Sequence, residues 1–130
     1  MSHLYGDIDL RVDGPVEAMT RVESELDLSV YDDPDAVSEF LEDWSKCRFG
    51  AHADSEGRCS LVLSKFYDPL ETVLQIIGHI GFQFSELALQ MTATVTDSAT
   101  GESEGYTVEK PAGVTDWGGD ESLFDMAYSY

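Results

Sequence analysis

Apolar and polar side chains alternate along SELALQMTATVTD (85–97), and this pattern constrains the fold more tightly than any other stretch. Positions 87, 89, 91, 93 and 95 carry Leu, Leu, Met, Ala and Val, while positions 90, 92, 94 and 96 carry Gln or Thr. A period of two puts the apolar set on one face of a β-strand. LYGDIDLRV, near the N-terminus, repeats the pattern with apolar residues at positions 4, 8, 10 and 12. Both stretches therefore predict half-buried strands.

Three helices are predicted by proline and capping signals that precede apolar residues at helical spacing. The first covers 15–26 and begins with proline, which suits the first turn of a helix. The second follows Asp33 as its N-cap and has apolar residues at positions 37, 40, 41 and 44. The third starts from a capping box formed by Asp68 and Glu71, is apolar on most sides, and is ended by Gly81.

The remaining apolar runs predict further strands. LSVY (28–31) forms a short strand, and RFGAHA (48–53) pairs with RCSLVLSKF (58–66) in a hairpin around the turn residues DSEG. The long alternating strand returns through the loop SATGESEG as YTVEK (106–110). Strands and helices mixed in this order are typical of the α+β class.

We therefore expect a single acidic α+β domain over 1–130. Its core would be one antiparallel sheet of about five strands with two to three helices packed on one face, and a ferredoxin-like arrangement is one candidate. The C-terminal segment, 111–130, combines turn residues with aromatic and acidic ones. It either lies over the core of its own domain or offers an aromatic and acidic contact to a partner.

The chain carries 26 carboxylate side chains against seven lysines and arginines, a formal net charge of −19. Solubility of a small domain needs a net charge of only about 2 to 8 in magnitude. Direct binding to nucleic acid or to a membrane is disfavoured, because both demand clustered cations, and a basic protein surface is the complementary partner. The chain has no long apolar stretch and no basic-then-apolar leader, so we expect a cytoplasmic protein, in the host cytoplasm if it is phage-encoded.

The acid is unevenly distributed along the chain. Residues 1–45 carry a net charge of −11, residues 46–96 of −1, and residues 97–130 of −7. Adaptation to high salt would spread acid over every exposed surface, whereas this asymmetry indicates an acidic face. A central segment buried as core would produce part of the same asymmetry.

The sequence shows no arrangement typical of catalysis or metal binding. Cys47, His52, Cys59 and His79 lack the paired spacing of a zinc site, and the cysteines are typical of buried small apolar residues. The clustered aspartates do not fit a calcium-binding loop, and the three histidines form no catalytic constellation. We therefore expect a protein without enzymatic activity, cofactor, metal or disulfide.

The longest acidic stretch, VESELDLSVYDDPDAVSEFLEDWS (22–45), holds nine carboxylates and no cation. In its helix, Asp35, Glu39 and Glu42 form one stripe, with Asp43 at the edge. Four charges over about 13 Å approach the axial charge density of one nucleic-acid strand. Such a stripe is either a solvated helix face or an array that fills a basic groove built for DNA or RNA. With neighbouring acids and the C-terminal segment, the expected partner-binding residues are Glu23, Glu25, Asp27, Asp32, Asp33, Asp35, Glu39, Glu42, Asp43, Trp117, Asp120, Glu121 and Asp125.

The first functional hypothesis is a non-enzymatic inhibitor or decoy that mimics DNA and blocks a nucleic-acid-binding protein. The small acidic proteins with which phages and mobile elements disarm restriction or CRISPR systems have this general character, although no motif of the chain carries the likeness. One alternative is an immunity or antitoxin-like protein that neutralises a cationic toxin. The other is a cytoplasmic domain adapted to high salt.

Overall fold

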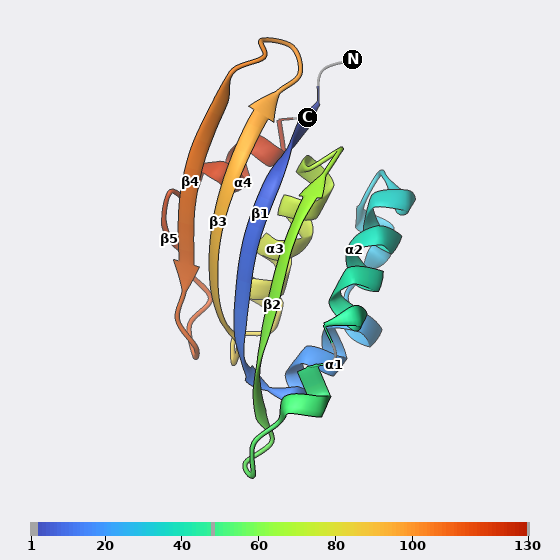
Figure 1. Cartoon of the computed structure of the whole chain (residues 1–130), viewed down its shortest axis with the longest axis vertical. Coiled ribbons are helices and arrows are strands. Elements are labelled where there is room, and N and C mark those ends of the chain that lie inside the picture. The colour runs from blue at the N-terminus through green and yellow to red at the C-terminus, as the bar shows by residue number, and fades with distance from the viewer. Residues whose placement is uncertain (1–2, 48, 130) are drawn as a thin grey trace.

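The computed structural model describes residues 3–47 and 49–129, which form a sheet and a layer of helices on one of its faces. In Figure 1 the sheet lies in front of α3 and α4, and α1 and α2 lie toward the right edge. No helix in this described part combines the length and the apolar composition that a membrane span requires. In chain order the elements are β1 (Leu4–Pro15), α1 (Val16–Glu25), η1 (Leu28–Val30), α2 (Pro34–Lys46), η2 (Phe49–His52), β2 (Arg58–Tyr67), α3 (Glu71–Gln83), β3 (Ala88–Asp97), β4 (Ser103–Lys110), β5 (Gly118–Gly119) and α4 (Ser122–Ala127).

The sheet has the strand order β2-β1-β3-β4-β5, and every neighbouring pair is antiparallel. The two strands predicted from alternation, β1 and β3, lie side by side within it. In one row across the sheet, Leu63, Leu10, Met91 and Val108 follow one another on β2, β1, β3 and β4, and all four are buried under the helices. The predicted α+β class, with one antiparallel sheet of five strands and helices on its apolar face, is confirmed.

The order of elements differs from a ferredoxin-like arrangement, which runs βαββαβ. Here α3 stands between β2 and β3, where the ferredoxin-like arrangement has a hairpin. The hairpin of this chain is β3–β4 instead, and it is the one predicted around the loop SATGESEG. β1 and β2 are neighbours although two helices separate them in the sequence.

The centre of the core is α3, which was predicted to be apolar on most sides. Val73, Leu74, Ile76, Ile77 and Ile80 have no exposed surface. β3 lies between β1 and β4 and buries its apolar face as well. α3 and the apolar face of β3 belong to the nearly neutral middle third of the chain, so burial explains part of the charge asymmetry along the sequence.

The second predicted helix, α2, begins where the capping signal places it. Asp33 accepts a hydrogen bond from Ala36 N at 3.0 Å, and proline takes the first helical position. The face formed by Val37, Phe40 and Trp44 is buried. The indole N–H of Trp44 donates to the carbonyl of Met19 in α1 at 3.1 Å, so the two helices are fixed against each other.

Two strand predictions are wrong. LSVY forms the short 3₁₀ turn η1, because Asp27 accepts hydrogen bonds from the backbone and hydroxyl of Ser29 and caps the turn. RFGAHA is not a strand: residues 49–52 form η2, and Arg48 lies outside the described residues. β2 pairs with β1 rather than in a local hairpin, because its inward-facing side chains match the longer apolar set of β1.

The predicted start and end of α3 are also wrong. The N-cap position is Leu70 and not Asp68. The carboxylate of Glu71 accepts a hydrogen bond from Leu4 N at 2.9 Å, which ties the helix to β1 instead of closing a capping box. α3 continues beyond Gly81 to Gln83. This glycine does not end the helix but leaves room for the ring of Trp117, which packs against it.

Candidate functional site

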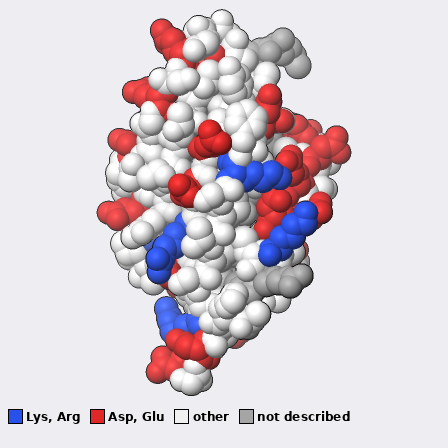
Figure 2. Space-filling view, viewed as in Figure 1, with Lys and Arg blue, Asp and Glu red and all other residues white. Residues whose placement is uncertain are grey.

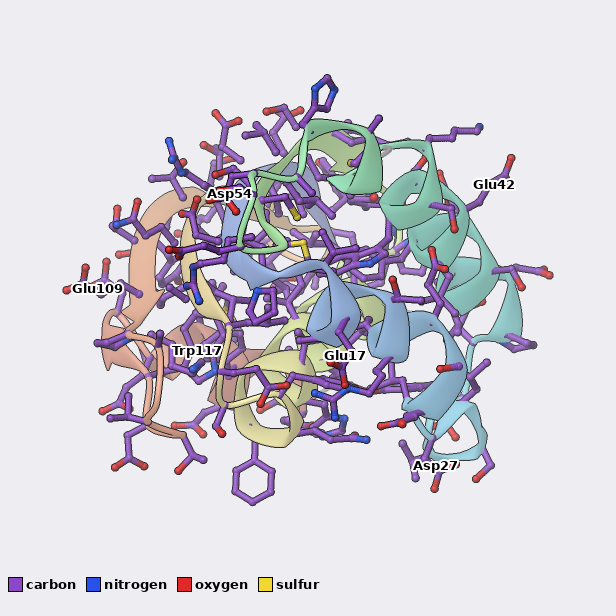
Figure 3. The ribbon with its side chains drawn as sticks, turned by 90° about the horizontal axis from the view of Figure 1, so that it is seen from below. Glu17, Asp27, Glu42, Asp54, Glu109 and Trp117 are labelled. Atoms are coloured by element: carbon purple, nitrogen blue, oxygen red, sulfur yellow. The ribbon has the colours of Figure 1, made fainter. Side chains whose placement is uncertain are left out.

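The first candidate surface is the acidic wall, which we define as the exposed side of α1, η1 and α2 (16–47). Residues 16–47 carry ten carboxylates and two cations, which gives a net charge of −8. Figure 2 shows acidic atoms gathered along the right margin, where α2 lies in Figure 1. In Figure 3, Asp27 and Glu42 lie on the right side of the molecule, and Glu17 lies nearer its middle.

The wall is rigid because its helices and their connection are fastened together. Besides the hydrogen bond from Trp44 to Met19, the hydroxyl of Ser45 in α2 donates to the carboxylate of Glu23 in α1. Asp27 and Asp33 each accept a backbone N–H of the turn that follows them. Hydrogen bonds from the hydroxyl and backbone of Ser29 lower the pKa of Asp27, so this capping carboxylate stays charged.

Arg21 couples the wall to the sheet. Its guanidinium lies 3.9 Å from Glu17 and 3.8 Å from Glu25, one helical turn away on either side. It also donates to Glu86, ahead of β3, and lies over the ring of Phe84 at 5.7 Å. The charge of Glu25, a predicted partner-binding residue, is therefore partly compensated within the fold.

A lysine from β2 neutralises part of the stripe predicted on α2. Lys65 lies 2.8 Å from Asp43 and 2.9 Å from Glu39, and these two hydrogen bonds raise the pKa of Lys65. Asp43 also accepts a hydrogen bond from the Tyr67 hydroxyl at 2.8 Å, and its side chain is only 15% exposed. Asp43 is therefore engaged inside the domain.

The wall also carries charge that no cation compensates, partly on that stripe and partly beside it. Glu42 pairs with Lys46 at 3.0 Å, an exposed contact one turn apart. Neither Asp32 nor Asp35 has a cationic partner in the described part of the chain, and Glu23 contacts only the serine hydroxyl. These three carboxylates are the ones a cationic partner would find free.

The open face of the sheet carries much less net charge than the wall. Figure 2 looks onto this face and shows its centre as mostly uncharged. A general acidic coat would give this face a net charge as negative as that of the wall, so its lower net charge favours an acidic wall over adaptation to high salt. Its outward-facing charged residues are Asp7, Asp9, Asp13 and Glu109 against Arg11 and Arg58, a net charge of −2, and its hydroxyl residues are Ser60, Ser64, Thr92, Thr94, Thr96, Ser103 and Thr107.

The second candidate surface is a groove of about 460 Å³ between α3 and residues 115–128. Trp117 lies so close to Gly81 that a Cβ there would come within 2.7 Å of the ring, and its indole N–H donates to the carbonyl of Gly78 at 3.4 Å. Phe124 packs against Trp117, with ring centroids 4.8 Å apart. The small residues of GHIG (78–81) allow this close packing, and the packing partners are two rings of the C-terminal segment.

His79 connects the groove with the wall. One ring nitrogen is hydrogen-bonded to the hydroxyl of Tyr31, between η1 and α2, and the other to that of Tyr128, after α4. Burial lowers the pKa of His79 from its ordinary value, so the neutral ring, which can donate through one nitrogen and accept through the other, predominates near neutral pH. One turn further along α3, Phe82 is 69% exposed.

Three exposed carboxylates line the groove, those of Asp116, Glu121 and Asp125. Within residues 3–47 and 49–129, no lysine or arginine forms an ion pair with any of them. Asp120, which the sequence grouped with them, has a different role. Its carboxylate accepts a hydrogen bond from Thr107 N at 2.9 Å and holds the chain against β4.

Lys110 fixes the start of the C-terminal segment. Its side chain is buried, and its Nζ donates to the carbonyls of Ser85, Pro111 and Val114 at 3.1, 2.9 and 2.8 Å. Gly113 N adds a hydrogen bond to the same Ser85 carbonyl. Burial lowers the pKa of Lys110. The segment therefore lies over the core of its own domain, one of the two alternatives predicted, and leaves the groove open on its outer side.

The two candidate surfaces lie on different sides of the molecule. In Figure 3, Trp117 is at the left, while Asp27 and Glu42 are at the right. The structure therefore does not bring Trp117, Glu121 and Asp125 together with the acids of the wall. The sequence did not predict Asp116, Phe82 or Tyr128 as site residues, and the glycines of GHIG were the only signal that a ring would pack on α3.

Both cysteines are free thiols. Cys59 is buried with its Sγ 3.3 Å from the Sδ of Met19, as expected for a small apolar residue, and Cys47 is half-buried. Burial raises the pKa of both thiols. Among the described residues, no group of three or more His, Cys, Asp or Glu side chains could hold a metal ion.

No protein-family model matches the chain, and no curated protein and no solved structure is significantly similar to it. The functional argument therefore depends on the geometry and charge of the two surfaces.

Proposed function

We propose that the protein is a non-enzymatic binding protein whose acidic wall occupies a basic, nucleic-acid-binding surface of another protein. The observation that carries this proposal is the concentration of charge, −8 over residues 16–47 beside −2 on the open sheet face. Like charges at this density repel one another and lower the stability of the fold. A cationic partner would remove that repulsion on binding.

The construction of the wall suits mimicry of a nucleic-acid backbone. A basic groove that binds nucleic acid gains free energy by releasing the condensed counterions, and a fixed row of carboxylates offers it the same exchange. The carboxylates of α1 and α2 are held in place before binding by the Trp44 and Ser45 hydrogen bonds. Little further ordering is then needed, which lowers the entropic cost of association.

A wall of this kind fills a groove and offers neither bases nor a cleavable bond, so the expected outcome is inhibition. In this proposal the protein belongs to the functional class with which phages and mobile elements block restriction or CRISPR nucleases. The partner is a protein or complex with a basic surface, and the protein itself binds no nucleic acid.

The test compares the wild-type protein with two variants that change its net charge equally. The wall variant combines Glu23→Gln, Asp32→Asn and Asp35→Asn, at carboxylates without a cationic partner. The control variant combines Glu102→Gln, Glu104→Gln and Glu109→Gln, at exposed positions of β4 and the loop before it. Proteins retained from a host lysate on each immobilised form are identified, and the Kd of the main one is then measured.

The wall variant should bind at least about tenfold more weakly, because it loses three carboxylates that would face the partner and a total of about 1.4 kcal/mol suffices for that factor. The control variant should stay within about threefold. Raising ionic strength from about 0.05 to 0.5 M should weaken binding mainly by slowing association. The retained protein should lose its DNA or RNA binding when this protein is added. A retained toxin without nucleic-acid binding would overturn the decoy in favour of the immunity alternative.

A further inference from the structure

The groove between α3 and the C-terminal segment offers a different chemistry from the wall. Trp117 and Phe124 form its inner side, and Phe82 and Tyr128, at 69% and 56% exposure, lie more openly around it. Aromatic side chains gathered at a concave and exposed site are typical of recognition surfaces. The volume of about 460 Å³ is within the range of sites that hold a side chain or a small ligand.

The charge of the groove points to the sign of its ligand. The faces of aromatic rings are electrostatically negative, and three free carboxylates, those of Asp116, Glu121 and Asp125, add formal charge. Both features attract a cation. An apolar ligand would leave the carboxylates facing it without solvent, and an anion would be repelled by them.

The rings are held in position without a ligand. Trp117 is placed by its contact with Gly81 and its hydrogen bond to the Gly78 carbonyl, and the segment leading to it is fixed by Lys110. A preorganised aromatic surface binds with less loss of side-chain freedom than a flexible one.

We propose that this groove binds an arginine side chain of the partner protein. A guanidinium is planar, so it can stack on an aromatic ring while its N–H groups donate to carboxylates at the rim. The inference deepens the proposed function and rests on it in one respect, that a basic partner supplies the arginine. The site itself does not depend on the wall.

The two tryptophans of the chain provide matched probes for this proposal. The Trp117 indole lines the groove, whereas the Trp44 indole is fully buried and hydrogen-bonded to the Met19 carbonyl. The indole N–H signals are recorded by ¹H–¹⁵N NMR while the blocked peptide GSRSRSG is added. The Trp117 signal should shift and saturate, and the Trp44 signal should stay in place. The same peptide with neutral citrulline for arginine should bind at least about tenfold more weakly.

Charge variants then separate the groove from the wall. The groove variant Asp116→Asn, Glu121→Gln, Asp125→Asn should lose the peptide response, while its unshifted Trp44 signal shows that the domain is folded. The Glu102, Glu104 and Glu109 control variant and the wall variant should both keep peptide affinity within about threefold. An equal affinity for the citrulline peptide, or an equal loss in the control variant, would overturn the proposal. If the wall binds its partner but the Trp117 signal does not shift when the peptide is added, the arginine site in the groove is refuted and the proposed function of the wall is not.

Discussion

The acidic wall and the groove are both negatively charged, but most carboxylates of the wall are engaged by cations, hydroxyls or backbone N–H groups of the fold. On the wall, Glu39 and Asp43 share Lys65, and Asp27 and Asp33 accept backbone hydrogen bonds. In the groove, the carboxylates have no cationic partner among the described residues and stand beside half-exposed rings. The number of acids in a stretch of sequence therefore gives its charge, whereas the partners of each carboxylate show where an incoming cation finds a free site.

Truncating an aromatic side chain should separate the two regions most strongly. Trp44→Ala leaves a cavity under the wall and removes the hydrogen bond to the Met19 carbonyl, so the free energy of unfolding should fall by about 3–5 kcal/mol. Phe82→Ala removes a ring that is 69% exposed and should cost less than about 0.5 kcal/mol. Urea unfolding of both variants measures the difference. A comparable loss for Phe82→Ala would mean that this ring belongs to the core.

Adding a methyl group to α3 should have the next largest effect, and only on the groove. In Gly81→Ala the new Cβ would lie 2.7 Å from the Trp117 ring, which must move, so stability should fall by about 1–3 kcal/mol despite the better helix propensity of alanine. Gly105→Ala is the control, because a Cβ there meets nothing within 4 Å. Denaturant unfolding and the peptide titration give both readouts. A more stable Gly81→Ala protein would show that Trp117 is not held against the helix.

Much of the fold could be predicted because its strongest signals are local. The alternation in β1 and β3 and the Asp33 cap of α2 need only neighbouring residues. LSVY is misassigned from the sequence because Asp27, just before it, caps a turn through the backbone N–H of Ser29. The choice of partner for β2 could not be predicted. It depends on whether the inward-facing side chains of β2 match those of β1, a strand that two helices separate from it in the sequence.

The candidate sites were predicted less well than the fold, because charge compensation is not local. Lys65 belongs to β2, and the sequence of α2 does not indicate that this lysine neutralises Asp43 and Glu39. The contact of Trp117 with Gly81 likewise joins segments that are distant in the chain. Composition located the acidic stretches, and only the folded arrangement showed which carboxylates are free.

Removing a lysine from the wall should have a smaller effect that depends on burial. Lys65→Gln leaves the carboxylate of Asp43, only 15% exposed, with the hydrogen bond from the Tyr67 hydroxyl and no ion pair, and should lower stability by about 1 kcal/mol. Lys46→Gln changes the net charge equally but breaks an exposed pair with Glu42, and should leave the thermal midpoint unchanged within error. Equal midpoints for the two variants would show that the Lys65 contacts do not stabilise the fold.

Titration of His79 should give the smallest effect, at the boundary between the two regions. In the neutral ring one nitrogen accepts from a tyrosine hydroxyl and the other donates to the second one, so both Tyr31 and Tyr128 are satisfied. Protonation turns both nitrogens into donors, so the hydroxyl that donated has to rotate its hydrogen away and accept instead. The ring is half-buried, and burial disfavours its charged form, so protonation weakens this link between the wall and the C-terminal segment.

Because burial holds the pKa of His79 below its ordinary value of 6.5, the unfolded chain binds this proton more readily than the folded one. The stabilisation from the neutral ring is complete above that value and is lost as pH falls through it toward the lower folded pKa. Thermal midpoints of the wild-type and His79→Gln proteins should therefore differ more at about pH 7.5 than at about pH 5.5. Carboxylate repulsion changes with pH in both proteins alike, so the difference between them isolates the histidine. A difference that stays constant, or grows at acid pH, would contradict the assigned role of the neutral ring.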